Sequence, residues 1–130
     1  MRQSIGAISL LVRDYDEAIT FYVDKLGFDL IADSDLGDGK RWVLVGPKNG
    51  TGAQLLLAKA VGPDQCASIG HQAGGRVFLF LYTDNFERDY AAMTARNISF
   101  LEAPRYEAYG TVAVFTDLYG TKWDLIELKS

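Results

Sequence analysis

Residues 5–27, IGAISLLVRDYDEAITFYVDKLG, decide the fold. The opening run IGAISLLV is apolar, contains β-branched residues and is short enough for a strand. Asp14 is followed three residues later by a glutamate, which is a capping-box signature, and apolar residues then recur at helical spacing until Gly27. The sequence therefore predicts a strand over 5–12 and a helix over about 15–26.

Three further strands are predicted after this helix. The segments FDLIADS, RWVLVG and AQLLLAKA have strand composition and are separated by turn sequences rich in Gly, Asp and Asn. The first module, about residues 4–60, is therefore predicted to be βαβββ. Residues 61–75, VGPDQCASIGHQAGG, mix Gly, Pro and polar residues without periodicity, which indicates a linker or a loop over a binding face.

The same order of elements begins again at Arg76. An apolar strand and a helix ending near Asn97 are followed by the strand-like segments ISFLEA, GTVAVFTD and KWDLIEL. An offset of 70 places Gly27 on Asn97, both at the ends of predicted helices, as expected of a duplication. We therefore predict an α+β fold whose second module spans about 76–130. The alternative is a single ferredoxin-like sandwich, which has two strands fewer than the sequence predicts.

Composition narrows the partners of this chain. Its 130 residues are 48% hydrophobic and 23% charged, which is typical of a globular protein. The net charge of −4 lacks the basic surplus that a phosphate backbone requires, so no nucleic-acid partner is expected. No apolar run approaches the roughly 18 residues that span a bilayer, and the N-terminus lacks the layout of a secretion signal. We therefore expect no membrane partner and a cytoplasmic location.

Three segments, VRDYDEAITFYVDKLGF, GGRVFLFLYTDNF and FTDLYGTKWDLIEL, resemble the vicinal oxygen chelate superfamily. This superfamily includes glyoxalase I, extradiol dioxygenases, and the fosfomycin and bleomycin resistance proteins. The resemblance covers nearly the whole chain and implies a single domain over residues 1–130. It implies two tandem βαβββ modules whose curved eight-stranded mixed sheet encloses a cavity. Because that cavity is commonly completed by dimerisation, a homodimer is expected.

The resemblance also implies a metal held by four side chains, one each from the first and last strands of each module. The corresponding positions here are Ala7, Gln54, Phe78 (Val77 if the register slips by one) and Asp124. The internal repeat supports this placement, because Gln54 and Asp124 are separated by 70 residues, and Ala7 and Phe78 by 71. Alanine and phenylalanine cannot bind a metal and an uncharged amide is a weak ligand. We therefore expect no cofactor.

The histidine and cysteine counts restrict the chemistry further. A single His71 excludes the 2-His-1-carboxylate iron site, and with it extradiol dioxygenase activity. His71 and the one Cys66 cannot form a Cys/His zinc site, and the lone cysteine excludes an intrachain disulfide. His71 from a partner chain could complete an intersubunit site, although a solvated or loop-bonding histidine is the simpler interpretation.

Strand alternation predicts which side chains line the cavity, since residues two apart share a face. The expected ligand-binding residues are Ser9, Gln54, Phe78, Phe80, Tyr82 and Asp124. They would form an apolar, aromatic pocket with few polar groups, as expected of a small-molecule site. The alternative interpretation is that these side chains simply fill the interior of the sheet.

Asp124 is the most informative of these residues. It lies between Trp123 and Leu125 on a predicted strand, so that burial would raise its pKa unless it finds donors. It is therefore a candidate catalytic general base or an anchor for a cation. The competing interpretation is a structural acceptor that binds Gln54 or a backbone amide.

Three functions from different classes are consistent with the sequence. The first is a metal-independent protein that binds a small molecule, and the acidic charge balance favours a cationic ligand. The second is a glyoxalase-, isomerase- or lyase-type enzyme whose divalent metal sits in an unusual site using Gln54 and Asp124. The third is a structural or regulatory module that retains the fold without small-molecule chemistry.

Overall fold

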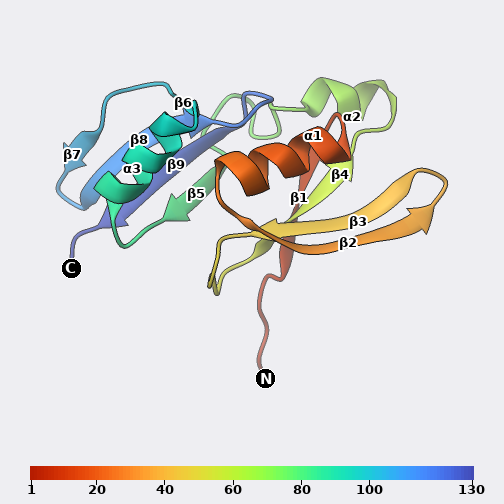
Figure 1. The fold of residues 1–130 in the computed structure, drawn as a ribbon, viewed down its shortest axis with the longest axis horizontal. Helices are drawn as coiled ribbons and strands as arrows, with labels where there is room; N and C mark the ends of the chain where they lie inside the picture. Colours follow the sequence, from red (N-terminus) through yellow and green to blue (C-terminus); the bar gives the residue numbers. More distant parts are fainter. The chain divides into compact units, whose positions relative to one another are not determined.

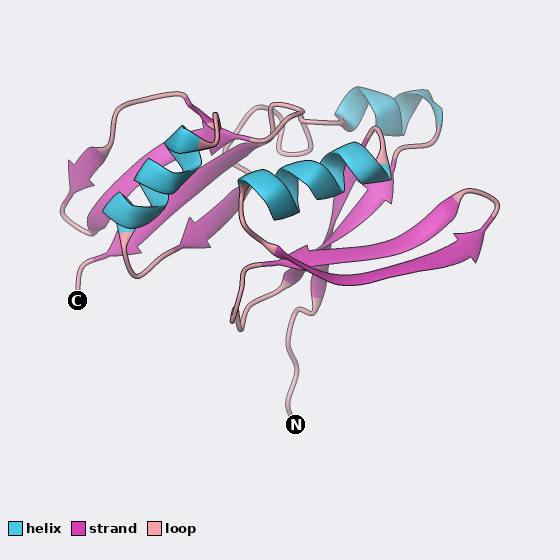
Figure 2. Cartoon of the chain, viewed as in Figure 1, coloured by secondary structure: helices cyan, strands magenta, loops and turns pink.

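The computed structural model describes residues 1–130, which divide into two compact units, Met1–Ile69 and Gly70–Ser130. We call these the N-terminal and the C-terminal unit. Each unit has one mixed sheet and a helix against one face of that sheet, as Figures 1 and 2 show for each unit separately. The predicted α+β fold with a repeated βαβββ order is confirmed. The strands form one sheet of four and one of five, because the C-terminal unit has one strand more than predicted.

The N-terminal unit begins with the strand and helix that the opening sequence predicts. Its elements are β1 (Ala7–Val12), α1 (Tyr15–Ile19), the π-helical turn η1 (Thr20–Lys25), β2 (Asp29–Gly37), β3 (Lys40–Gly46), β4 (Gln54–Lys59) and α2 (Gly62–Ser68). The sheet order is β1-β4-β3-β2, in which β1 and β4 are parallel and the other neighbours are antiparallel.

The helix over 15–26 is confirmed together with both of its end signals. The Asp14 side chain accepts a hydrogen bond from the Glu17 backbone N–H at 2.9 Å, which satisfies one of the free donors of the first turn. At the other end Leu26 caps the helix and Gly27 has a φ of 84°, a conformation that glycine adopts without steric penalty. The last turn is π-helical, which the spacing of apolar residues does not predict.

The expectation of a loop over 61–75 is wrong for its first half, which forms α2. The helix has a proline in its first turn, where a fixed φ favours helix initiation. The Gln65 side chain also accepts a hydrogen bond from the Val61 N–H at 2.8 Å. No residue of α2 is buried, so the helix lacks the apolar periodicity by which helices are recognised in a sequence.

The C-terminal unit repeats this order with one addition. Its elements are β5 (Leu79–Tyr82), α3 (Phe86–Ala95), β6 (Ser99–Phe100), β7 (Arg105–Glu107), β8 (Gly110–Thr116) and β9 (Lys122–Leu128). The sheet order is β5-β9-β8-β6, with β7 also paired to β8, and only β5 and β9 are parallel. The added strand β7 lies where the sequence indicates a loop, because three residues are too few to show an alternating pattern.

An aromatic cluster joins α3 to its sheet. The ring of Tyr90 is centred 5.5 Å from Phe86 within the helix and 4.5 Å from Phe100 on β6. Phe115 on β8 continues the cluster, at 5.6 Å from Phe100 and 5.7 Å from Trp123 on β9. These contacts fix which face of the sheet α3 covers. Residues of alternate parity on β5, β8 and β9 therefore lie on the opposite face, where no helix of this unit packs.

The turn between β8 and β9 depends on one buried carboxylate. Asp117 Oδ1 accepts hydrogen bonds from the N–H groups of Tyr119 and Thr121, both at 2.9 Å. We expect Asp117→Ala to lower the free energy of unfolding by about 2 kcal/mol, because two N–H groups lose their acceptor. Urea unfolding measures the change. Asp117→Asn keeps an acceptor oxygen and should lose less, and an equal loss in both variants would contradict this explanation.

Candidate ligand-binding face

The sheet of the C-terminal unit presents a row of predicted site residues on the face away from α3. In the register of β5 and β9, Phe80 is the partner of Asp124, and Tyr82 is the partner of Ile126. Paired residues of a ladder share a face, so all of these side chains lie on one side. We call this side the helix-free face, defined by Phe80, Tyr82, Arg105, Val112, Val114, Asp124 and Ile126.

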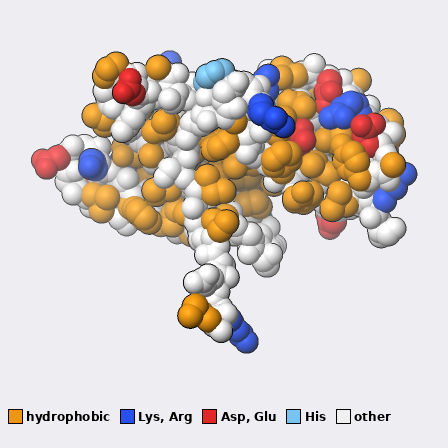
Figure 3. Space-filling model, turned by 180° about the vertical axis from the view of Figure 1, so that it is seen from behind, with side chains coloured by type: hydrophobic (Ala, Val, Ile, Leu, Met, Phe, Trp, Pro, Cys, Tyr) orange, Lys and Arg blue, Asp and Glu red, His pale blue; other side chains and the backbone are white.

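Two aromatic rings are the most exposed part of the helix-free face. Phe80 is 53% exposed and Tyr82 is 63% exposed, whereas the neighbouring Ile126 and Val112 are buried. Figure 3 views the molecule from the side opposite to α3, and the C-terminal unit, on the right, shows hydrophobic side chains gathered around acidic and basic groups. Exposed apolar groups that gather on one face are typical of a surface that contacts a ligand or a partner.

Asp124 is the one acidic residue that β9, which lies between β5 and β8, places on this face. Its Oδ1 atom is buried and has no hydrogen-bond partner. Desolvation raises the pKa of the Asp124 carboxyl above its ordinary value, an effect that Arg105 opposes and Glu102 reinforces. The alternative of a structural acceptor is therefore not supported at Oδ1, because no donor reaches it.

The remaining charges near Asp124 are paired with one another. Arg105 Nε donates to both carboxylate oxygens of Glu102, at 3.0 and 3.1 Å, and another guanidinium nitrogen donates to Glu107 at 3.2 Å. Glu102 also accepts a hydrogen bond from the Val114 N–H at 3.0 Å. The hydrogen bond and the charge of Glu102 raise the pKa of Arg105, so it stays charged. The ion pair of Arg105 with Glu102 is local, because the two residues are three apart in the sequence, whereas the Val114 donor of Glu102 lies on β8 and could not be located from the sequence.

The raised pKa of Asp124 leads to a prediction about stability and pH. Because the folded state binds this proton more tightly than the unfolded state, ionising Asp124 destabilises the fold as the pH rises above about 3.8. Asp124→Asn removes that charge and should be more stable than the native protein at pH 7, by roughly 1 kcal/mol. The difference should shrink as the pH falls toward the ordinary carboxyl range. Melting temperatures of both proteins between pH 3 and 8 test this, and a less stable variant at pH 7 would show that the carboxylate has donors.

The predicted residues of the N-terminal unit lie on the corresponding face of their own sheet. Gln54 is the parallel partner of Ala7, and Ser9 is the partner of Leu56, on the neighbouring strands β1 and β4. Leu10 and Val12 of β1 and Leu55 and Leu57 of β4 are buried on the other face, whereas Ser9 is exposed and Gln54 is half-buried. That these residues and those of the helix-free face line one cavity stays a prediction.

The register of β5 differs from the one that the internal repeat indicates. The repeat gives Phe78 the place that Ala7 has beside Gln54, but Phe80 is the residue paired with Asp124. Phe78 lies just before β5, and its N–H donates to the Lys122 carbonyl oxygen at 2.9 Å. The pair β1 and β4 and the pair β5 and β9 therefore differ in register. A sequence offset between the two modules aligns one strand at a time and cannot show this difference.

The donor set does not fit a resident divalent metal of the kind that the resemblance implies. Gln54 stands beside Ala7, and Asp124 stands beside Phe80, so each sheet offers one oxygen donor and one hydrocarbon. No group of three or more His, Cys, Asp or Glu side chains with metal-binding geometry occurs in the chain. A catalytic zinc site keeps three protein ligands.

None of the helices is long and apolar enough to cross a membrane.

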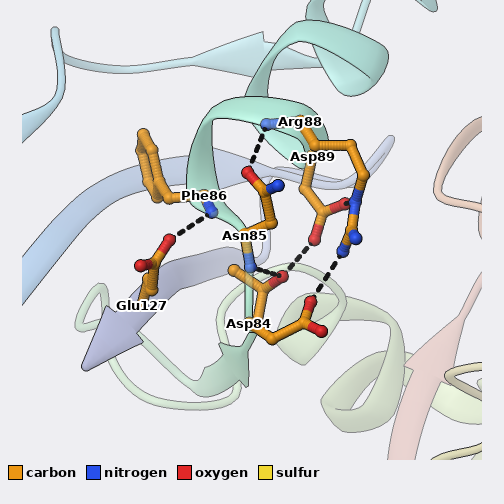
Figure 4. A network of polar contacts seen from close by, with 7 residues as sticks. Asp84, Asn85, Phe86, Arg88, Asp89 and Glu127 are labelled. Carbon is orange, nitrogen blue, oxygen red and sulfur yellow. Dashed lines mark hydrogen bonds and ion pairs between the residues drawn. The ribbon is translucent and has the colours of Figure 1, made fainter. Parts of the chain in front are cut away.

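A concavity of about 530 Å³ lies on the helix-covered side at the start of α3. Three of its polar side chains have partners at the start of α3, as Figure 4 shows: Glu127 accepts a hydrogen bond from the Phe86 N–H at 2.6 Å. Asn85 accepts one from the Arg88 N–H at 3.0 Å, and Asp84 forms an ion pair with the Arg88 side chain at 2.9 Å. These three groups stabilise the start of α3 and are therefore not available to a ligand without loss of those contacts.

Comparison with known proteins places the chain in a family. The family model described as Glyoxalase/Bleomycin resistance protein/Dioxygenase superfamily matches residues 4–125. An uncharacterized protein of Shewanella frigidimarina (strain NCIMB 400) is 57% identical over 129 residues, covering 98% of this chain and 96% of that protein. The uncharacterized protein YetH of Bacillus subtilis (strain 168) is 31% identical over 130 residues, covering 98% of this chain and all of YetH.

Two solved structures share both fold and sequence with this chain. The crystal structure of UcmS2 is similar with a TM-score of 0.84 and 29% identity, over 97% of this chain and 98% of that one. TnmS3, described as an antibiotic binding protein from Streptomyces sp. CB03234, is similar with a TM-score of 0.81 and 30% identity, over 98% of both chains. The chain therefore belongs to the glyoxalase/bleomycin resistance protein/dioxygenase superfamily.

Proposed function

We propose that this protein binds a small aromatic molecule on the helix-free face of its C-terminal unit and does so without a resident divalent metal. The observation that carries the proposal is the pair of exposed rings, Phe80 and Tyr82, beside the unsatisfied Asp124. Predominantly apolar surface with a few convergent polar groups is typical of a small-molecule site. The similarity to TnmS3, described as an antibiotic binding protein, supports the same class of function.

The energetics of this face favour binding over a purely structural role. Covering exposed apolar surface contributes about 25 cal/mol per Å² removed from water. Aromatic rings in contact with one another add about 0.5–1.5 kcal/mol. A flat aromatic ligand would obtain both contributions from Phe80 and Tyr82, which lie on the same side of one strand.

Isothermal titration with 1-naphthylmethylamine tests the proposal. The full chain is titrated in the presence of EDTA, and again after dialysis against Zn²⁺ or Ni²⁺. We expect saturable binding with one affinity in all conditions. Binding that appears only with metal would instead support the glyoxalase-, isomerase- or lyase-type alternative with a site at Gln54 and Asp124. No saturable binding in any condition would contradict the proposal.

We also propose that the protein is a cytoplasmic homodimer. The N-terminal unit exposes apolar side chains along β2 and β3, including Leu30, Ile31 and Trp42, each 44% exposed. Such side chains on an accessible strand pair support association with a second copy. We predict that sedimentation equilibrium at micromolar concentration gives twice the chain mass of 14.4 kDa. A mass equal to that of one chain would contradict the homodimer.

A further inference from the structure

The strongest unexplained feature of the molecule is the Asp124 carboxylate. Oδ1 is shielded from solvent, yet it accepts no hydrogen bond. A buried acceptor without a donor is destabilising by about 1–3 kcal/mol, and more if it is charged. Asp124 is nevertheless placed beside the two most exposed aromatic residues of its face. The fold provides no group that stabilises the Asp124 carboxylate at Oδ1. A cationic group on the ligand would provide a partner for this carboxylate.

The fold around Asp124 does not supply the missing donor. The residues paired with it on the neighbouring strands are Phe80 and Val114, whose side chains have no hydrogen-bond donor. Arg105 is close enough to lower the pKa of the Asp124 carboxyl, but its guanidinium is bound to Glu102 and Glu107. Asp124, Glu102 and Glu107 contribute three carboxylates here and Arg105 contributes one guanidinium. The net charge around Asp124 is therefore negative.

We infer that the ligand of the helix-free face carries a protonated amine, which forms an ion pair with the partly exposed Asp124 carboxylate while its aromatic body contacts Phe80 and Tyr82. This inference rests on the proposed function and names the ligand class. A charge-assisted hydrogen bond is roughly twice as strong as a neutral one, and it is strongest where water is excluded. A cation is also attracted to the faces of the two rings. An anionic ligand would instead meet a negative, desolvated carboxylate.

Three probes with one ring system separate the charge from the aromatic contact. They are 1-naphthylmethylamine, which is protonated at neutral pH, the neutral 1-naphthalenemethanol, and the anion 1-naphthoate. Each is titrated into the full chain at pH 7 in the presence of EDTA. We expect the ammonium to bind about tenfold more tightly than the alcohol, a difference of 1.4 kcal/mol, and naphthoate to bind most weakly.

Two variants that each remove one negative charge assign the preference to a residue. In Asp124→Asn the preference for the ammonium over the alcohol should fall below about threefold, while the alcohol keeps its affinity. Glu87→Gln removes the same charge from α3, which packs on the other face, and should keep the tenfold preference. Melting curves confirm that both variants are folded.

The outcomes distinguish this inference from the proposed function on which it rests. If the ammonium and the alcohol bind the native protein equally well, the proposed function stands and the inference is overturned. If Asp124→Asn keeps the preference, or if Glu87→Gln loses it as well, the inference is also overturned, because the discrimination then comes from the overall charge. If none of the three probes binds, both fail.

Discussion

Replacing Gly110 by alanine is expected to lower the free energy of unfolding by about 3 kcal/mol or more, from overpacking and backbone strain together. Gly110 has a φ of +155°, which side chains rarely adopt, and it pairs with Glu107 on β7 and with Leu128 on β9. A Cβ atom at this position would lie well inside contact distance of the Glu127 carbonyl oxygen. Because backbone surrounds Gly110, the clash can be relieved only by separating the strands.

Urea unfolding of Gly110→Ala beside Gly52→Ala measures this effect. Gly52 lies in the loop before β4, and nothing lies within 4 Å of the position that a Cβ would take there. Its replacement should therefore change stability by no more than about 0.5 kcal/mol. Equal stability of the two variants would contradict the close approach of β8 and β9 at Gly110. Since typical domains are stable by only about 5–15 kcal/mol, the expected loss is a large fraction of the total.

The second large effect is expected at Phe80, and it concerns binding rather than stability. Phe80→Ala should weaken binding of 1-naphthylmethylamine about tenfold or more, because the ligand loses one of its two ring contacts. The unfolding free energy should change by less than about 1 kcal/mol, since more than half of this side chain is already exposed. Titration calorimetry and urea unfolding of the same preparation separate the two quantities.

Tyr106→Ala is the matched control for this variant. Tyr106 is 78% exposed, and it pairs with Thr111 on the helix-covered face of the same sheet. Tyr106→Ala removes an exposed aromatic ring from the face that the proposed ligand does not contact. The affinity for 1-naphthylmethylamine should therefore not change. If Tyr106→Ala weakens binding as much as Phe80→Ala does, the ligand binds on the side of α3.

The elements with local signals could be predicted from the sequence. The first helix is marked by the Asp14 cap and by Gly27, and both act in the structure as their residue types suggest. The helix α2 and the strand β7 have no apolar face to bury or are too short to show one, so they were not predicted.

The candidate site was predictable only in part, for a physical reason. Strand alternation correctly places Phe80, Tyr82 and Asp124 on one side of a strand pair, because that periodicity is local. The unsatisfied Oδ1 of Asp124 and the hydrogen bond from the Val114 N–H to Glu102 depend instead on which strands become neighbours. The register that selects Phe80 over Phe78 is likewise set by the whole sheet rather than by the repeat.

Amide chemical-shift mapping tests the central claim, that the helix-free face binds ligand without metal. The ¹⁵N-labelled full chain is titrated with 1-naphthylmethylamine in the presence of EDTA. We predict that the largest shift changes fall on residues 79–82 of β5 and on Asp124. Changes centred on residues 84–90, at the start of α3, or no changes until a divalent metal is added, would contradict the account.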